Sequence, residues 1–377
     1  MKLRLALVAC ISISLFYGNF AAAQYSVSSP DDKIRVEITI DDTPEYSVFL
    51  NEKRIMEPSG IALILKNDKD SENYVALLSK SWQTNENYTP VVPFKSSSVT
   101  ENSNNILISF SNELELQFTV TNNGFAWRWL YDFPKKIQVE NEIVNFNFTH
   151  SRKVWFPEEN FMISHYERRY LQLPADSISP EMFCSLPALV ELRSGIKIGI
   201  TEANLYDYPN LFLRGTDGGE GLHGKFPSVV LKAKNKKNSD RNEEILREAD
   251  YIADTDGNRS FPWRVVMIAE RDKDLLTNDM VYMLSKKCKP VDFDLVKPGR
   301  VAWDWWNAWN IYNVDFKAGI NTRTYKYYID FAAKYGLEYI IMDEGWSQTT
   351  DLYNVIPEID LEEIIRYGNE KNVGVIL

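Results

Sequence analysis

The hydrophobic pattern of the chain changes near residue 290, and this change constrains the fold more than any other feature. Before it, apolar and polar residues alternate along short runs separated by turn residues. Alternation with a period of two is typical of strands with one buried and one solvated face. The clearest runs are 33–40, 105–111, 114–120, 197–203 and 263–270. Because no long helical period interrupts them, residues 24–290 are predicted to form a large antiparallel β-sandwich.

After a proline-bearing connector, the pattern becomes strand, helix, strand, helix, strand. The apolar runs are 301–306, 338–342 and 372–377, and a helical period begins at 322 and closes on Gly336. A second helix opens at Asp360, which has a glutamate three residues later as in a capping box. Strands that alternate with helices form right-handed parallel βαβ units.

The residues after the connector, 291–377, are too few for a closed eight-stranded barrel, which takes about 250 residues. The last apolar run reaches Leu377 with no turn or polar tail after it, although a parallel strand needs cover on both faces. We therefore expect a multidomain β plus α/β chain whose second part holds the first three strands of a truncated (β/α)8 barrel. A complete small βαβαβ domain packed on the sandwich is the alternative.

The first 23 residues are predicted to be a signal peptide. Lys2 and Arg4 precede an uncharged apolar stretch, and small residues up to Ala23 offer a cleavage site. The stretch is too short to span a membrane. We expect export to a bacterial periplasm, with a lipid anchor through Cys10 as the less favoured alternative. The mature chain would keep two cysteines, Cys184 and Cys288, and their pairing stays open.

Composition excludes several classes of partner and site. The formal net charge is −11, and the basic stretch near residue 235 is expected to be a solvated loop, so neither a nucleic acid nor an anionic membrane is expected as a partner. The three histidines lack zinc-ligand spacing. No GxSxG, Walker or dinucleotide motif is present in the sequence. Oligomeric state cannot be read from these features.

Polar and aromatic side chains follow the first two strands after the connector. They are Asp304, Trp305, Trp306, Asn307, Asp343, Glu344 and Trp346. Side chains at the carboxyl ends of barrel strands face the active site, so we expect the two clusters to converge. Carboxylates accept hydrogen bonds from sugar hydroxyls, and tryptophan faces stack on sugar rings, so this set predicts a substrate-binding site. Alternatively, one acid caps the next segment or pairs with Arg323, and at least one tryptophan belongs to the core.

Several motifs, in this order, resemble glycoside hydrolase family 97 over essentially the whole mature chain. They are NNGFAWRW (122–129), VWFPEENF (154–161), YERRY (166–170), ITEANLYDYP (200–209), FPWRVVMIA (261–269), VAWDWWNAWN (301–310) and YIIMDEGW (339–346). The WDWWNAW form is more similar to the retaining α-galactosidase branch of that family than to its inverting α-glucosidase branch.

The resemblance implies a calcium ion (Ca2+) near the catalytic centre. One glutamate ligand in the family comes from the sandwich domain in a Glu-x-x-Tyr setting, which Glu167 and Tyr170 match. Calcium takes several oxygen ligands, so one glutamate is not a complete site. The remaining ligands are expected beyond Leu377. The alternative for Glu167 is a surface salt bridge with Arg168 or Arg169.

The resemblance also implies where the reacting carboxyl groups lie. In the retaining branch, the nucleophile is an aspartate at the end of the fourth barrel strand, and the acid/base is a later glutamate. Both are expected beyond Leu377, so this chain is expected to contain no catalytic residue and to be inactive alone. Asp343 follows the second strand and would bind substrate.

These observations predict the N-terminal portion of an exo-acting enzyme that releases α-linked galactose from oligosaccharides with retention, through a covalent glycosyl-enzyme intermediate. Three alternatives stay open. The first is an inverting α-glucosidase of the same family, and the second is a noncatalytic carbohydrate-binding module. The third is a fragment that does not fold stably.

Overall fold

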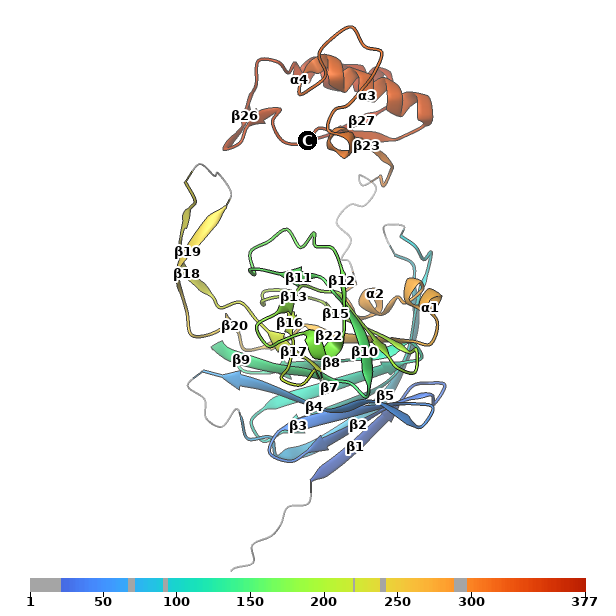
Figure 1. Cartoon of the computed structure of the whole chain (residues 1–377), viewed down its shortest axis with the longest axis vertical. Coiled ribbons are helices and arrows are strands. Elements are labelled where there is room, and N and C mark those ends of the chain that lie inside the picture. Colours follow the sequence, from blue (N-terminus) through green and yellow to red (C-terminus); the bar gives the residue numbers. More distant parts are fainter. Residues whose placement is uncertain (1–21, 67–71, 91–93, 220, 238–241, 288–296) are drawn as a thin grey trace, which may run out of the picture. The chain divides into compact units, whose positions relative to one another are not determined.

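The computed structural model describes residues 22–66, 72–90, 94–219, 221–237, 242–287 and 297–377. The chain forms mostly antiparallel β-sheets with few helices, and it divides into two compact units. The first unit holds the residues up to Tyr88, Val99–Val229 and Ala249–Lys286, and the second holds the remainder (Figure 1). The predicted boundary at 290 lies outside the described residues.

The predicted signal peptide also lies almost wholly outside the described residues, and so do Cys10 and Cys288. Export, cleavage and a periplasmic location therefore stay predictions. Cys184 is buried and has a free thiol in the part of the chain that the structure describes. No helix among the described residues is long and apolar enough to cross a membrane.

The first large sheet of the first unit is antiparallel and ten-stranded over the described residues. Its strands are, in spatial order, β1 (Ala23–Ser28), β2 (Ile34–Ile40), β3 (Pro44–Leu50), β4 (Lys53–Leu65), β9 (Lys136–Asn147), β17 (Gly221–Lys225), β16 (Phe212–Arg214), β13 (Phe183–Cys184) and β11 (Glu158–Glu159), with β20 (Ala253–Asp256) paired to β9. Strand β2 alternates buried and half-buried residues along its whole length, as its sequence pattern predicts.

The second large sheet is likewise antiparallel and ten-stranded within the described ranges. Its strands are β12 (Leu171–Leu173), β10 (Ser151–Phe156), β14 (Ala188–Leu192), β15 (Lys197–Ala203), β22 (Trp263–Ala269), β8 (Gly124–Tyr131), β7 (Leu114–Thr121), β6 (Val99–Phe110) and β5 (Ala76–Tyr88), with β21 (Arg259–Ser260) paired to β8. All the runs named from the sequence are strands, and the run predicted at 105–111 is longer because β6 begins at Val99.

The two sheets face each other across one hydrophobic core. The ring of Tyr46 on β3 contacts Phe118 on β7 and Phe125 on β8 edge to face, with centroids 5.9 and 5.5 Å apart. Trp127 and Trp129, both fully buried, fill the same layer. Such aromatic contacts add to the burial of apolar area that holds two sheets together.

One buried ion triad ties the two layers. Arg264 on β22 is fully buried and donates to Glu142 on β9 of the other sheet at 2.5 Å. It also donates to Glu202 on the neighbouring strand β15 at 2.6 Å. Burial raises the pKa of Glu202, against the lowering effect of Arg264.

The first unit also contains two short helices and a 3-10 turn. The second unit contains a separate two-stranded hairpin. The helices are α1 (Asp272–Leu276), α2 (Met280–Leu284) and the 3-10 turn η2 (Ala175–Ser177). The hairpin pairs β18 (Val230–Asn235) with β19 (Glu243–Glu248). The prediction of a loop near residue 235 is therefore wrong for residues 232–235, because these residues belong to strand β18. Their charge is met across the hairpin, for example by Lys234 with Glu244.

The rest of the second unit has a three-stranded parallel sheet with two helices. The strands lie in the order β23 (Val301–Trp303), β24 (Tyr339–Ile341) and β27 (Gly374–Ile376). The other elements are η4 (Asp304–Asn307), α3 (Thr322–Tyr335), β25 (Ser347–Gln348), β26 (Asp351–Val355) and α4 (Leu361–Glu370). The parallel βαβ units predicted from the sequence are thus present.

The two caps predicted from the sequence, Gly336 and Asp360, are present, and the structure adds Asn321 at the start of α3. Asn321 accepts from the backbone N–H of Thr324 at the start of α3, and Gly336 ends that helix with φ +69°. Asp360 accepts from the backbone N–H of Glu363 at 2.9 Å at the start of α4. These caps satisfy backbone groups that a helix terminus leaves unpaired.

Candidate active site

The predicted site residues follow the carboxyl ends of β23 and β24. These strands pair in parallel, with Val301 opposite Tyr339 and Trp303 opposite Ile341. Because the two parallel strands end at the same level in this register, the residues that follow them leave the sheet at the same edge. That edge is where parallel α/β folds place their ligands.

Asp304 is fully buried beneath this edge. Its Oδ2 accepts hydrogen bonds from Trp309 Nε1 at 2.9 Å and from Tyr325 OH at 2.8 Å. Its Oδ1 accepts from the backbone N–H of Asp343 at 3.3 Å. Burial and the Asp304 carboxylate raise the pKa of Tyr325, so the phenol stays protonated as a donor. The sequence predicts that Asp304 contacts substrate, whereas here its carboxylate binds groups of the protein itself.

Asp343 is half-buried, and its position is fixed by neighbouring donors. Its Oδ2 accepts from Trp303 Nε1 at 3.0 Å, and its Oδ1 accepts from the backbone N–H of Glu344 at 2.7 Å. The next residue, Gly345, has φ +101°, and a Cβ there would lie 2.5 Å from Ile320 Cδ1. Glycine thus lets the chain turn sharply directly after the two acids.

A cavity of about 450 Å³ opens beside these acids. It is lined by Trp305, Trp309, Ile320, Asp343, Glu344, Gly345 and Thr349. The rings of Trp305 and Trp309 lie 4.8 Å apart between centroids, with 57° between their planes. Arg323, the predicted alternative partner of these acids, pairs with Asp315. The cavity therefore combines carboxylate acceptors with indole faces.

The other predicted residues lie away from this cavity. Trp306 is 83% exposed and lines a different, larger hollow of about 700 Å³, whose wall is mostly aromatic and aliphatic. Asn307 also lines it, and its side chain accepts from Tyr328 OH at 2.6 Å. Trp346 is buried in the core of the second unit, packed in the same cluster as Ile340. The sequence had predicted that at least one tryptophan is a core residue.

The backbone after β23 differs from the prediction. The strand expected over 301–306 ends at Trp303, because Asp304–Asn307 form a 3-10 turn. Ala308 and Trp309 follow with φ +50° and +54°, a left-handed conformation that costs energy in residues other than glycine. This turn carries Trp309 into the cavity, and the Trp309 N–H donates to the Asp304 carbonyl at 3.0 Å.

Glu167, the predicted calcium ligand, lies in the first unit between β11 and β12. Its carboxylate is exposed and makes no ion pair within the described residues, so the alternative of a salt bridge to Arg168 or Arg169 does not occur there. Arg168 pairs instead with Glu159. Glu167 thus fits the role of one oxygen ligand. The described residues contain no cluster of three or more acidic, cysteine or histidine side chains that could hold a metal.

A buried carboxylate anchors the segment that carries Glu167. The side chain of Glu159 is fully buried and accepts from Arg168 Nε at 2.9 Å and from Ser164 Oγ at 2.7 Å. It also accepts from Ser185 Oγ at 3.2 Å. The loop around Glu167 is therefore held at two points to the sheet edge below it.

Carboxylates and indoles around a cavity at the end of parallel strands are typical of proteins that act on carbohydrates. The comparisons with known proteins agree. The model for the glycosyl-hydrolase 97 N-terminal domain matches residues 27–286, and the model for glycoside hydrolase 97 matches residues 305–377. The chain belongs to glycoside hydrolase family 97.

Two curated relatives are α-galactosidases by name. A retaining alpha-galactosidase from Bacteroides thetaiotaomicron is 32% identical over 372 residues, which cover 95% of this chain and 56% of the relative. A probable retaining alpha-galactosidase from Streptomyces bingchenggensis is 26% identical over 134 residues, covering 33% of this chain and 20% of that protein. The chain spans little more than half the length of the first relative.

Solved structures show a similar fold. A family 97 enzyme from Pseudoalteromonas sp. strain K8, in complex with acarbose, matches with a TM-score of 0.78 at 21% identity, covering 93% of this chain and 53% of that one. A beta-arabinopyranosidase matches with a TM-score of 0.69 at 19% identity, covering 93% and 55%. At such low identity, these likenesses concern the fold alone.

Proposed function

We propose that the protein is a retaining α-galactosidase, and that this chain supplies its sandwich domain and the first three strands of its (β/α)8 barrel. The relative that is 32% identical over 95% of the chain supports the activity. The parallel order β23, β24, β27 with helices between them supports the barrel. A barrel begins with strands that pair in this sequential order.

The observation that carries the proposal is the cavity between Trp305, Trp309 and the acids after β24. Asp343 and Glu344 would accept hydrogen bonds from galactose hydroxyls, and an indole would cover the apolar face of the ring. Asp343 reaches this position because Trp303 and the Asp304 carboxylate hold it from two sides. We assign Asp304 a positioning role in place of the predicted substrate contact.

Hydrolysis with retention needs two carboxyl groups about 5–5.5 Å apart, one as nucleophile and one as acid and then base. The resemblance to the family leads us to expect both beyond Leu377, and under this proposal the chain alone would bind sugar without cleaving it. Asp343 would orient the ring so that the anomeric carbon faces the nucleophile. Correct orientation of this kind supplies much of the rate enhancement of an enzyme.

Calcium would be held in part by Glu167, whose carboxylate is available for it. When bound, the ion would supply fixed positive charge near the reacting sugar. The Glu159 anchor would keep Glu167 in place, since Arg168 and Ser164 on the same loop donate to it.

The test is to express the whole reading frame and assay p-nitrophenyl α-galactoside and α-glucoside, with and without a calcium chelator. We expect cleavage of the galactoside, first release of the α-anomer by proton NMR, and loss of activity that added calcium restores. Asp343→Asn should raise KM and lower kcat. The matched surface variant Glu370→Gln, on α4, should change neither.

Other outcomes would identify the alternatives. Cleavage of the glucoside with first release of the β-anomer would show an inverting α-glucosidase. Saturable sugar binding without hydrolysis of either substrate would show a noncatalytic binding module. Activity that a chelator leaves unchanged would remove the role of Glu167 in metal binding.

A further inference from the structure

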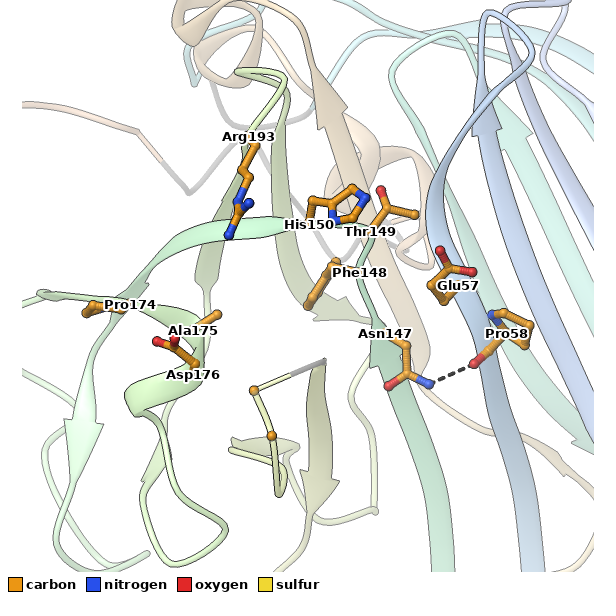
Figure 2. Close-up of a pocket in the computed structure, with 12 residues that line it drawn as sticks. Glu57, Pro58, Asn147, Phe148, Thr149, His150, Pro174, Ala175, Asp176 and Arg193 are labelled. Carbon is orange, nitrogen blue, oxygen red and sulfur yellow. Dashed lines mark hydrogen bonds between the residues drawn. The ribbon is translucent and has the colours of Figure 1, made fainter.

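The first unit contains a cavity of its own, of about 690 Å³ (Figure 2). This volume lies in the range of small-molecule sites, roughly 300–1,000 Å³. The lining residues come from β4, the end of β9, η2, the turn after β14 and the loop after β16. They are Glu57, Pro58, Asn147, Phe148, Thr149, His150, Pro174, Ala175, Asp176, Arg193, Gly218 and Gly219.

The walls of this sandwich cavity are fixed by internal hydrogen bonds. Asn147 Nδ2 donates to the carbonyl of Pro58 at 2.7 Å, as Figure 2 shows, and Thr149 Oγ1 donates to the carbonyl of Ile55 at 3.1 Å. Gly219 has φ +70°, and a Cβ there would lie 2.2 Å from the Cα of Asp176. Only glycine allows that loop to pack so closely on η2.

Three polar side chains in the cavity have no partner of their own. Arg193, His150 and Asp176 form no side-chain hydrogen bond or ion pair with the described residues. His150 has φ +47°, a conformation uncommon in residues other than glycine, and its carbonyl accepts from the N–H of Arg193 at 3.0 Å. Strained positions of this kind cluster at binding sites. Arg193 and His150 thus line the same cavity, and both side chains are solvent-exposed and have no protein partner among the described residues.

The chemistry of the lining selects a class of ligand. Arg193 and His150 offer donors, whereas Asp176 and Glu57 offer acceptors on other segments. Glu57 pairs with Arg54, so the permanent charges of the lining without a protein partner in the described part of the chain are Arg193 and Asp176, and their balance favours a neutral ligand. Sugar hydroxyls both donate and accept, so they can bind to both kinds of group, while Phe148 is buried and belongs to the hydrophobic core of the sandwich. We propose that the sandwich cavity is a second carbohydrate-binding site, which holds a neutral oligosaccharide.

This site is separate from the proposed catalytic function, because it uses only residues of the first unit. It would retain a glycan chain on the sandwich independently of the sugar bound beside Asp343. Raffinose and maltotriose, an α-galactoside and an α-glucoside, are suitable neutral probes.

The test is calorimetric titration of the chain with each probe, in the wild type and in an Asp343→Asn variant that weakens the barrel cavity. We expect binding to survive in Asp343→Asn, and to weaken about tenfold or more when Arg193→Ala is added, because a charge-assisted donor is lost. Asp176→Asn, which keeps the size of the side chain, should weaken it in the same direction. Arg271→Ala, at an exposed arginine of the same unit that pairs with Asp274, should leave it unchanged.

Two results would overturn the proposal. One is the absence of binding of either probe to Asp343→Asn at millimolar concentration. The other is binding to Asp343→Asn that neither Arg193→Ala nor Asp176→Asn weakens while both variants keep the wild-type circular dichroism spectrum. Failure of the proposed α-galactosidase activity would appear separately, as a whole protein that cleaves no galactoside although the sandwich cavity still binds sugar.

Discussion

Replacing Asp304 by asparagine tests whether this residue holds the candidate active site together. The wild-type carboxylate accepts from Trp309 and Tyr325 through Oδ2 and from the Asp343 N–H through Oδ1. Asparagine has one acceptor oxygen and one donor nitrogen. If the oxygen takes the Oδ2 position, the amide nitrogen faces the N–H of Asp343, and two donors meet.

The expected loss in free energy of unfolding follows from these hydrogen bonds. A buried donor left without an acceptor costs about 1–3 kcal/mol, so we expect Asp304→Asn to lower the free energy of unfolding of the second unit by that amount. Asp304→Ala removes both acceptor oxygens, and with them all three hydrogen bonds, and leaves a void, so it should cost about 3 kcal/mol or more. Tyr325→Phe removes a single donor and should cost about 1 kcal/mol.

Urea unfolding followed by tryptophan fluorescence measures these differences, because four tryptophans lie in the segment 303–309. Sugar binding by the same variants should weaken together with stability, since Asp343 loses its support. Unchanged unfolding of Asp304→Asn, with a large loss of affinity, would refute the positioning role and favour direct contact with substrate. Glu370→Gln serves as the surface control.

Three further changes test other parts of the structure. Gly345→Ala should destabilise the second unit by about 1–3 kcal/mol, measured by urea unfolding, because it forces a left-handed backbone and a contact with Ile320; an unchanged midpoint would contradict the observed turn. Glu159→Gln should lower the thermal midpoint and expose the loop around Glu167 to limited proteolysis. An unchanged midpoint together with an unchanged cleavage pattern would contradict the anchoring role of Glu159. Hydrogen bonds from Arg300 lower the pKa of Glu338 to about 2 from an ordinary 4.5, so the stability it adds is present above pH 4.5 and lost as pH falls toward 2. Glu338→Gln should therefore unfold earlier than wild type at pH 7 and equally at pH 2, and a constant difference would be inconsistent with that pKa.

Most of the fold can be predicted from the sequence where a local pattern decides the structure. Strand β2 alternates strictly, and helices α3 and α4 carry the caps Asn321 and Asp360, so local chemistry fixes them. The end of β23 could not be predicted in this way. An apolar run with two tryptophans favours a longer strand, whereas burial of Asp304 depends on Tyr325, which lies 21 residues further along the chain.

The candidate sites show the same limit. The convergence of the two strand ends follows from the rules for parallel sheets, and it brings Trp305, Asp343 and Glu344 to one cavity. Trp309 was missed, although it lies in the same tryptophan-rich motif, because its left-handed backbone has no sequence signal. The sandwich cavity has no motif at all, since its walls come from segments between residues 57 and 219.

The ion triad of the sandwich has a consequence for folding. Side chains alternate between the faces of a strand, so a shift of β22 by one residue would turn Arg264 away from the core and leave Glu142 buried without a cation. An unpaired buried charge costs about 3–5 kcal/mol. A shift by two residues would keep the apolar face of β22 buried, but it would still move Arg264 away from Glu142 and Glu202. The triad therefore penalises shifts of β22 relative to β15 and β9 that alternating apolar residues alone would tolerate.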